Sequence, residues 1–178
     1  MRDRYEGAEE FDEFLAGVEE HEELWHEMAR RARVPEEFLE RVRQLEGEWH
    51  LLVLLEDWCG DAINTVPLIA KLAEEAPNVD LRVLGRDANP DLMDAHLSNG
   101  ARAIPVVMVL DANYNELGWW GSRPSELQEW VISEGLQLPP EERYAKIRGW
   151  YARDRGRSTL EEIVSLLEEC QERRAALA

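Results

Sequence analysis

The pattern of apolar and polar positions divides the chain into two helical stretches with a strand-and-helix stretch between them. Apolar side chains near both ends of the chain recur three and four positions apart, which is the spacing of amphipathic helices. We therefore expect a helical N-terminal extension over residues 1–48 and a helical C-terminal extension over residues 138–178. Both should pack on a core formed by residues 49–137, within a single structural domain.

The central stretch begins with a continuous apolar run, Trp49 to Leu55. This run is too short for an independent helix and is typical of a strand that is covered on both faces. Helix and strand patterns then alternate until a hairpin that turns through residues 111–113. We expect strands at 49–55, 79–84, 106–110 and 114–119, and helices at 60–76, 90–97 and 124–134. This βαβαββα order predicts an α/β fold with a parallel portion and an antiparallel edge.

Charge and cysteine content narrow the classes of partner. The net charge is −18, from 38 acidic and 20 basic residues, and such a field repels nucleic acid and anionic membrane surfaces. The longest apolar run is too short to span a bilayer, and the N-terminus lacks the apolar stretch of a signal peptide. Two cysteines do not form a secreted disulfide framework, so we expect a cytoplasmic protein.

The two cysteines differ in their sequence surroundings. Cys170 continues an apolar helical stripe, which indicates a structural residue of the core. Cys59 lies where a buried strand ends and a helix begins, so the first-turn amides and the helix dipole point at its sulfur. This position stabilises a thiolate, the reactive form of cysteine.

Four features in order along residues 49–134 resemble the thioredoxin family. Trp58-Cys59-Gly60 matches the family's Trp-Cys-Gly at the end of the central strand, and Pro67 matches the proline that kinks the following helix. Ile104-Pro105 matches the pair whose proline is cis in this fold, and Gly121 matches the glycine after the hairpin. The resemblance implies a thioredoxin-like core with helical extensions at both ends.

The resemblance also implies a role for each site residue. A cis Pro105 would bring its loop beside Cys59 and leave the backbone of Ile104 free to pair with an extended substrate. Trp58 and Trp120 would flank the sulfur as an apolar rim. We thus expect Cys59 as the catalytic residue, with the substrate bound by Trp58, Gly60, Ile104, Pro105 and Trp120.

Several positions depart from the family pattern. Ala62 stands where dithiol members carry their second cysteine, and Val53 stands where they carry a buried aspartate. Without a second thiol, reduction by two coupled thiols cannot run. Acidic residues near the thiol also disfavour a thiolate, namely Glu56, Asp57 and Asp61. Finally, the N-terminal stretch indicates helix without a clear strand, so the first βα unit of the family is expected to be missing.

Three functional interpretations are open. In the first, Cys59 exchanges with a disulfide as a single thiol, and a small thiol or a protein resolves the mixed disulfide. In the second, the chain is a non-catalytic binding module that uses the cis-proline groove, and Cys59 is a sensor or a relic. In the third, which ranks last, one cysteine and an external thiol hold a metal cluster. We expect no metal site, no cofactor, and a protein or small thiol or disulfide as partner.

Overall fold

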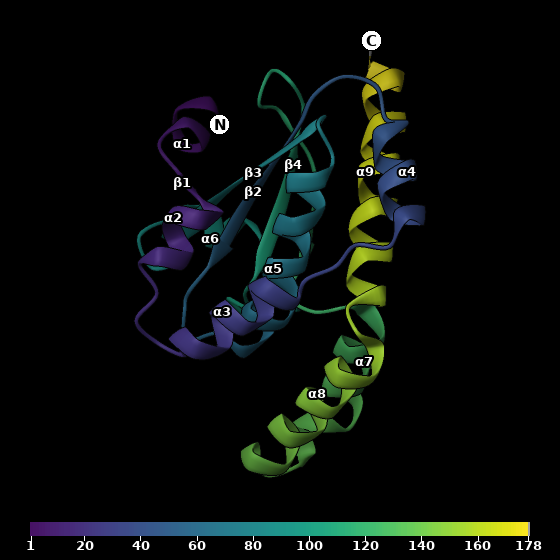
Figure 1. Ribbon diagram of the computed structural model, residues 1–178. Coiled ribbons are helices and arrows are strands. Elements are labelled where there is room, and N and C mark those ends of the chain that lie inside the picture. Colours follow the sequence, from purple (N-terminus) through teal and green to yellow (C-terminus); the bar gives the residue numbers. More distant parts are fainter. Residues whose placement is uncertain (178) are drawn as a thin grey trace.

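Five strands form one mixed sheet at the centre of the computed structural model, which describes residues 1–177 (Figure 1). The strand order is β1-β3-β2-β4-β5, with β2 parallel to β3 and antiparallel to β4, and with β5 antiparallel to β4. The strands are β1 (Glu9–Glu10), β2 (Trp49–Leu55), β3 (Val79–Gly85), β4 (Val106–Leu110) and β5 (Glu116–Gly121). The predicted α/β core with its closing antiparallel hairpin is confirmed.

The apolar sequence of β2 accounts for its central place in the sheet. Every residue of this strand except His50 is buried, and Val53 pairs with Val83 on one side and with Val107 on the other. A strand with neighbours on both edges and helices on its faces must be apolar on both sides. The C-terminal end of β2 therefore lies in the middle of the sheet, and the segment with Trp58 and Cys59 follows it.

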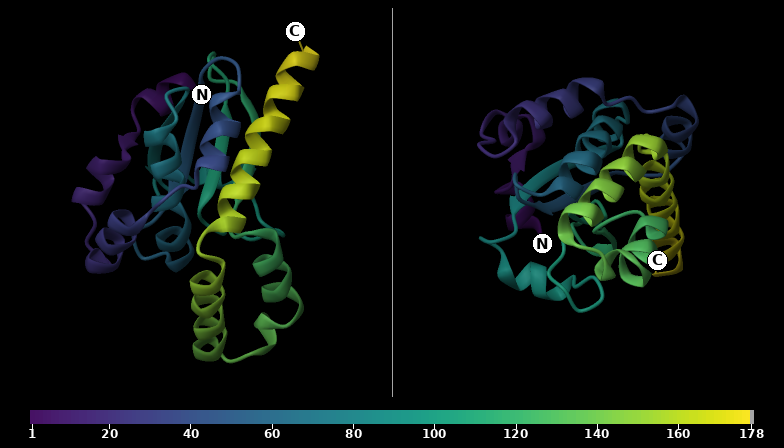
Figure 2. Two further views of the ribbon diagram at one scale, coloured as in Figure 1. Left: turned by 45° about the vertical axis from the view of Figure 1, so that its right-hand side comes forward. Right: turned by 90° about the horizontal axis from the view of Figure 1, so that it is seen from below.

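Helices cover the sheet, and one helical pair extends beyond it. Helices α5 and α9 pack beside each other against the sheet, with α3 on α5 and α4 on α9 (Figure 1). Helices α7 and α8 form a hairpin that projects past the end of the sheet (Figure 2, green). The helices are α1 (Arg2–Glu6), α2 (Phe11–Ala16), α3 (Glu22–Arg31), α4 (Glu36–Arg43), α5 (Gly60–Glu75), α6 (Pro90–Ala95), α7 (Ser125–Ser133), α8 (Pro140–Asp154) and α9 (Arg157–Leu177), and a 3-10 turn covers Gly135–Gln137.

The α7–α8 hairpin has a small apolar core of its own. Leu127 and Val131 of α7 are buried against Ile147 and Tyr151 of α8, and this cluster is separate from the main core. The main core runs from Tyr5 in the N-terminal extension to Cys170 in α9.

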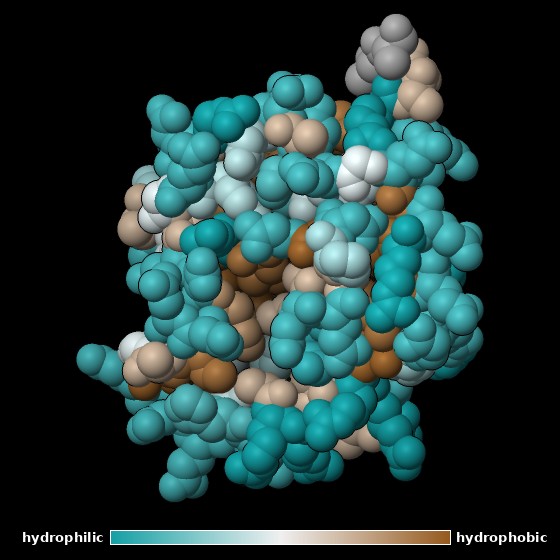
Figure 3. Space-filling model, turned by 45° about the horizontal axis from the view of Figure 1, so that its top comes forward, coloured by the Kyte–Doolittle hydropathy of each residue, from teal (hydrophilic) through white to brown (hydrophobic). Residues whose placement is uncertain are grey.

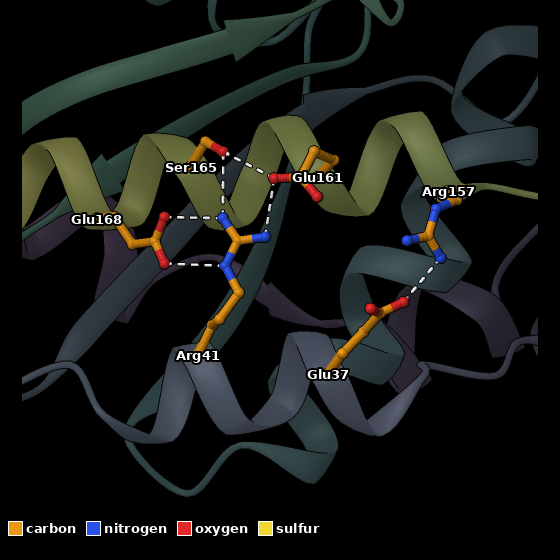
Figure 4. Close-up of polar contacts among 6 residues, drawn as sticks. All are labelled: Glu37, Arg41, Arg157, Glu161, Ser165 and Glu168. Carbon is orange, nitrogen blue, oxygen red and sulfur yellow. Dashed lines mark hydrogen bonds and ion pairs between the residues drawn. The ribbon is translucent and has the colours of Figure 1, made fainter.

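The two helical extensions are tied to each other by Arg41. Its guanidinium donates to both oxygens of Glu168, at 2.9 and 2.8 Å, and to Glu161 at 2.8 Å, which links α4 to α9 (Figure 4). A second pair, Arg157 with Glu37 at 2.7 Å, joins the same two helices. Residues more than a hundred positions apart in sequence are thus held side by side.

The prediction that the N-terminal stretch contains no strand was wrong. A two-residue strand, β1, lies there and pairs antiparallel with β3, with Glu9 opposite Val83 and Glu10 opposite Arg82. Both residues of β1 are exposed glutamates, so the strand has none of the alternating apolar pattern that would predict a strand from the sequence. The edge of β3 supplies the pairing that the local sequence does not predict.

Charged residues make up 33% of the chain, and the net charge is −18. Figure 3 shows one face on which hydrophilic residues prevail, with a hydrophobic region near its centre. Among residues 1–177, no helix is both long enough and apolar enough to cross a membrane.

Candidate functional site

Cys59 is the N-cap residue of α5, at the junction predicted from the sequence. Its backbone N–H donates to the Glu56 carbonyl at 3.1 Å, and its own carbonyl accepts the first helical bond from Ile63 at 3.0 Å. The thiol is 7% exposed and donates a hydrogen bond to the Ile104 carbonyl oxygen at 3.3 Å. The structure therefore brings together Cys59 and the Ile104-Pro105 loop, which lie 45 positions apart in the chain.

The Ile104–Pro105 peptide bond is cis, and Gly121 packs directly against this loop. A Cβ atom at Gly121 would lie 2.5 Å from the Pro105 carbonyl oxygen, a distance that real side chains do not adopt. The reason is the register of the hairpin, which pairs Gly121 with Val106. The glycine is needed here for close approach of two backbones.

Opposing influences act on the Cys59 thiol. Burial is the largest, and it raises the thiol pKa to about 11, since a buried sulfur loses the water that stabilises a thiolate. The nearby Asp61 carboxylate raises the pKa further, whereas hydrogen bonds from the backbone amides of Ala62 and Asp61 lower it. Burial outweighs the helix N-terminus, so Cys59 is protonated at neutral pH.

Asp61 is held by two residues that no sequence motif brought to the site. Arg123 lies 2.7 Å from one carboxylate oxygen, and the Tyr151 hydroxyl donates to the other at 2.9 Å. The Asp61 side chain is only 11% exposed, and burial raises the pKa of its carboxyl group despite these partners. No sequence motif connects Tyr151 or Arg123 to the thiol, because both contacts depend on the packing of elements far apart in sequence.

The acidic residues before Cys59 have structural partners rather than facing the thiol. The Glu56 carboxylate accepts the Asp87 N–H at 2.8 Å. The Asp57 carboxylate accepts the amides of Glu19 and Glu20, both at 3.0 Å. Of the three acidic residues named from sequence, Asp61 is the one that acts on the thiol pKa.

The N-terminal extension also holds this segment. The indole N–H of Trp25, in α3, donates to the Asp57 carbonyl at 2.7 Å, and Trp25 is fully buried. This hydrogen bond connects the N-terminal extension to Asp57, the residue before Trp58. The extension thus fixes the backbone that leads into Cys59, a role that its helical periodicity does not predict.

The two tryptophans of the expected rim differ in exposure. Trp58 is 45% exposed, and the Arg86 guanidinium lies over its ring at 4.9 Å. Trp120 is 8% exposed, and its indole N–H donates to Glu162 of α9 at 2.6 Å. Ile104 and Pro105 are buried as well. Of the expected binding residues, Trp58 and Gly60 are therefore exposed, and α9 of the C-terminal extension covers Trp120.

Neither cysteine forms a disulfide within residues 1–177. Cys59 and Cys170 are both free and buried. Cys170 packs under β5, where a Cβ atom at Gly118 would lie 3.2 Å from its sulfur, and burial raises its thiol pKa to about 11. Within residues 1–177 no group of three or more histidine, cysteine or acidic side chains is arranged to hold a metal ion.

Comparisons with solved structures support the fold. A protein of unknown function from Pseudomonas aeruginosa superposes with a TM-score of 0.73 at 21% identity, covering 93% of this chain and 95% of that one. A structure described as an HIV epitope-scaffold superposes with the same TM-score at 20% identity, covering 94% of this chain and 97% of that one. At these identities the likeness concerns the fold. No curated protein matches the sequence.

The family is shown by a sequence model. The model described as "Thioredoxin" matches residues 8–141, which include the N-cap thiol, the cis-proline loop and most of the N-terminal extension. The match is thus wider than the stretch on which the sequence motifs lie. This chain belongs to the thioredoxin family.

Proposed function

We propose that this protein carries out thiol-disulfide exchange with a single thiol, Cys59, which is held protonated between reactions. The observation that carries the proposal is the position of Sγ, 3.3 Å from the Ile104 carbonyl and within reach of the amides of Asp61 and Ala62. These amides stabilise negative charge on the sulfur once the proton leaves. The Ile104-Pro105 loop lies where a disulfide-bearing segment would approach.

The reaction needs no second cysteine in the chain. The Cys59 thiolate attacks one sulfur of a disulfide, so that a new sulfur–sulfur bond forms and the old one breaks. The other sulfur leaves as a thiolate and takes up a proton. An external thiol then attacks the substrate sulfur of the mixed disulfide, which releases the Cys59 thiolate and leaves a disulfide between the external thiol and the substrate. A second external thiol cleaves that disulfide, so two external thiols are oxidised to one disulfide for each substrate disulfide reduced.

The raised pKa of Cys59 sets the expected rate. With a pKa of about 11, roughly one thiol in ten thousand is ionised at pH 7. Exchange should therefore be slow at neutral pH and should accelerate about tenfold for each pH unit until the pKa is approached.

The same raised pKa favours a second candidate, a binding module without redox turnover. In that case Cys59 acts as a packed hydrogen-bond donor to Ile104, and partners are recognised through Trp58 and its surroundings. The two candidates differ in whether a mixed disulfide forms at all.

Intact mass after incubation of the whole protein with glutathione disulfide, over a series of pH values, tests the proposal. We expect one added glutathione, formed faster as the pH rises. Cys59→Ser should abolish the adduct, whereas the matched variant Cys170→Ser should retain it. Absence of the adduct at every pH, or its persistence in Cys59→Ser, would contradict single-thiol exchange and leave the binding module as the better account.

A further inference from the structure

A cavity of about 660 Å³ lies between α3, α5 and α8, and Cys59 is not among its lining residues. Its volume falls in the range of small-molecule sites. The lining includes the apolar side chains of Met28, Pro67 and Leu68, together with Tyr151 and the polar residue Asn64. The cavity is thus partly apolar and is open enough to admit a ligand.

The charge of the cavity is opposite to that of the protein. Four arginines line it, and none of the lining residues is acidic, in a chain with 38 acidic residues and a net charge of −18. The four are Arg31, Arg33, Arg148 and Arg155. Because guanidinium groups bind carboxylates and phosphates through paired hydrogen bonds, this lining selects for oxyanions.

Intramolecular hydrogen bonds and ion pairs do not occupy all the donor groups of these arginines. Arg31 pairs with Glu27 at 2.9 Å, and Arg33 donates to the carbonyls of Ala32 and Arg30. Arg148 and Arg155 have neither an ion pair nor a side-chain hydrogen bond among residues 1–177. Two guanidinium groups on the α8 side therefore keep their donors for a ligand.

Helix ends explain only part of the arrangement. Helices α3 and α8 both end at this cavity, and arginine near a helix C-terminus is favourable in itself. That effect is confined to the last turn of a helix, which accounts for Arg31 and the capping position of Arg155. Arg148 lies more than one turn before the end of α8 at Asp154, so the helix dipole does not account for its place at the cavity.

We propose that this cavity binds a small organic molecule that carries at least two oxyanion groups, carboxylate or phosphate, on a partly apolar body. Guanidinium groups on the α3 side and the α8 side would hold the anionic groups, and Pro67 and Leu68 would contact the apolar part. The site does not include Cys59 and does not depend on its chemistry.

Calorimetric titration of the whole protein with two probes tests this proposal. Adenosine diphosphate presents phosphates, and glutathione disulfide presents carboxylates. At least one should bind with one-to-one stoichiometry, and more weakly as salt is raised. Binding of one probe alone identifies the preferred oxyanion. If neither probe binds at millimolar concentration, the proposal is overturned.

Variants of α8 locate the binding. Arg148→Ser should weaken binding about tenfold, the effect of losing one charge-assisted hydrogen bond. The control Arg153→Ser removes another exposed arginine of α8 that does not line the cavity, and it should change the affinity less than twofold. Equal weakening by the two variants would mean that only the general charge matters and would overturn the site. Cys59→Ser should bind as tightly as the wild type, which separates this proposal from thiol exchange.

Discussion

The Tyr151 hydroxyl donates a 2.9 Å hydrogen bond to the Asp61 carboxylate, across 90 positions of sequence. This bond joins the α7–α8 hairpin to the first turn of α5, two residues after Cys59. Tyr151 also lines the arginine-rich cavity, so it belongs both to the surroundings of the thiol and to the proposed oxyanion site. The C-terminal extension is therefore part of the candidate site rather than an external cover.

Removal of this hydroxyl should destabilise the protein. Tyr151→Phe leaves the buried Asp61 carboxylate with one fewer donor, and we expect a loss of about 1.5–3 kcal/mol in the free energy of unfolding, the usual range for a hydrogen bond to a charged group. Urea denaturation measures the loss. Tyr144→Phe on the same helix is the control, because Tyr144 is 51% exposed, and it should change stability by less than about 0.5 kcal/mol. Equal stability of the two variants would show that the bond to Asp61 contributes nothing.

Two glycines at the site should respond in opposite ways to the same substitution. Gly121→Ala forces a Cβ atom against the Pro105 carbonyl and should cost about 1–3 kcal/mol, as overpacking does. Gly60→Ala meets nothing within 4 Å in the first turn of α5 and should be neutral or stabilise by up to about 1 kcal/mol. Thermal and urea unfolding of the two variants give the comparison. A neutral Gly121→Ala would contradict the close approach of β5 to the cis-proline loop.

The buried His96 should make stability depend on pH. Its Nε2 lies 2.7 Å from a Glu116 carboxylate oxygen, and this hydrogen bond raises the His96 pKa above its usual value of about 6.5. A histidine whose pKa is raised by folding binds its proton more tightly when folded. Its contribution is complete below the unfolded pKa and is lost as the pH rises through the higher folded value.

Unfolding of Glu116→Gln measures this contribution. The variant removes the charge that favours protonated His96, so its stability should fall less than that of the wild type as the pH rises from about 6 upward. Glu129→Gln, an exposed glutamate of α7, controls for the change in net charge. Identical pH profiles for wild type and Glu116→Gln would exclude the His96–Glu116 pair as the cause.

Arg41 should contribute to stability in a salt-dependent manner. Arg41→Ala removes the hydrogen bonds to Glu161 and Glu168 that join α4 to α9, and we expect a loss of about 1 kcal/mol at low salt. The loss should shrink at high salt, because all three side chains are partly exposed. Arg30→Ala, an exposed arginine of α3, provides a surface control. A loss that does not change with salt would point to packing of the Arg41 stem instead of its charge.

The sequence alone determined the central fold and the position of Cys59 where a strand leads into a helix. The apolar run of β2, the alternating elements after it and the motifs at Cys59, Pro67, Pro105 and Gly121 were sufficient, because each reflects a local requirement of strand burial, helix start or backbone approach. Helical periodicity likewise predicted both extensions. The two-residue β1 could not be predicted in this way, because its pairing depends on the neighbouring strand and not on its own pattern.

Only the tertiary structure decided the environment of the thiol and the position of the arginines. Burial of Cys59, the pairing of Asp61 with Arg123 and Tyr151, and the coverage of Trp120 by α9 all depend on contacts between residues far apart in sequence. The same is true of the arginines that line one cavity from α3 and α8. A local sequence pattern determines which face of a helix is buried. The packing of the whole core determines where two helices meet. The pKa of Cys59 depends on that packing, because burial raises it.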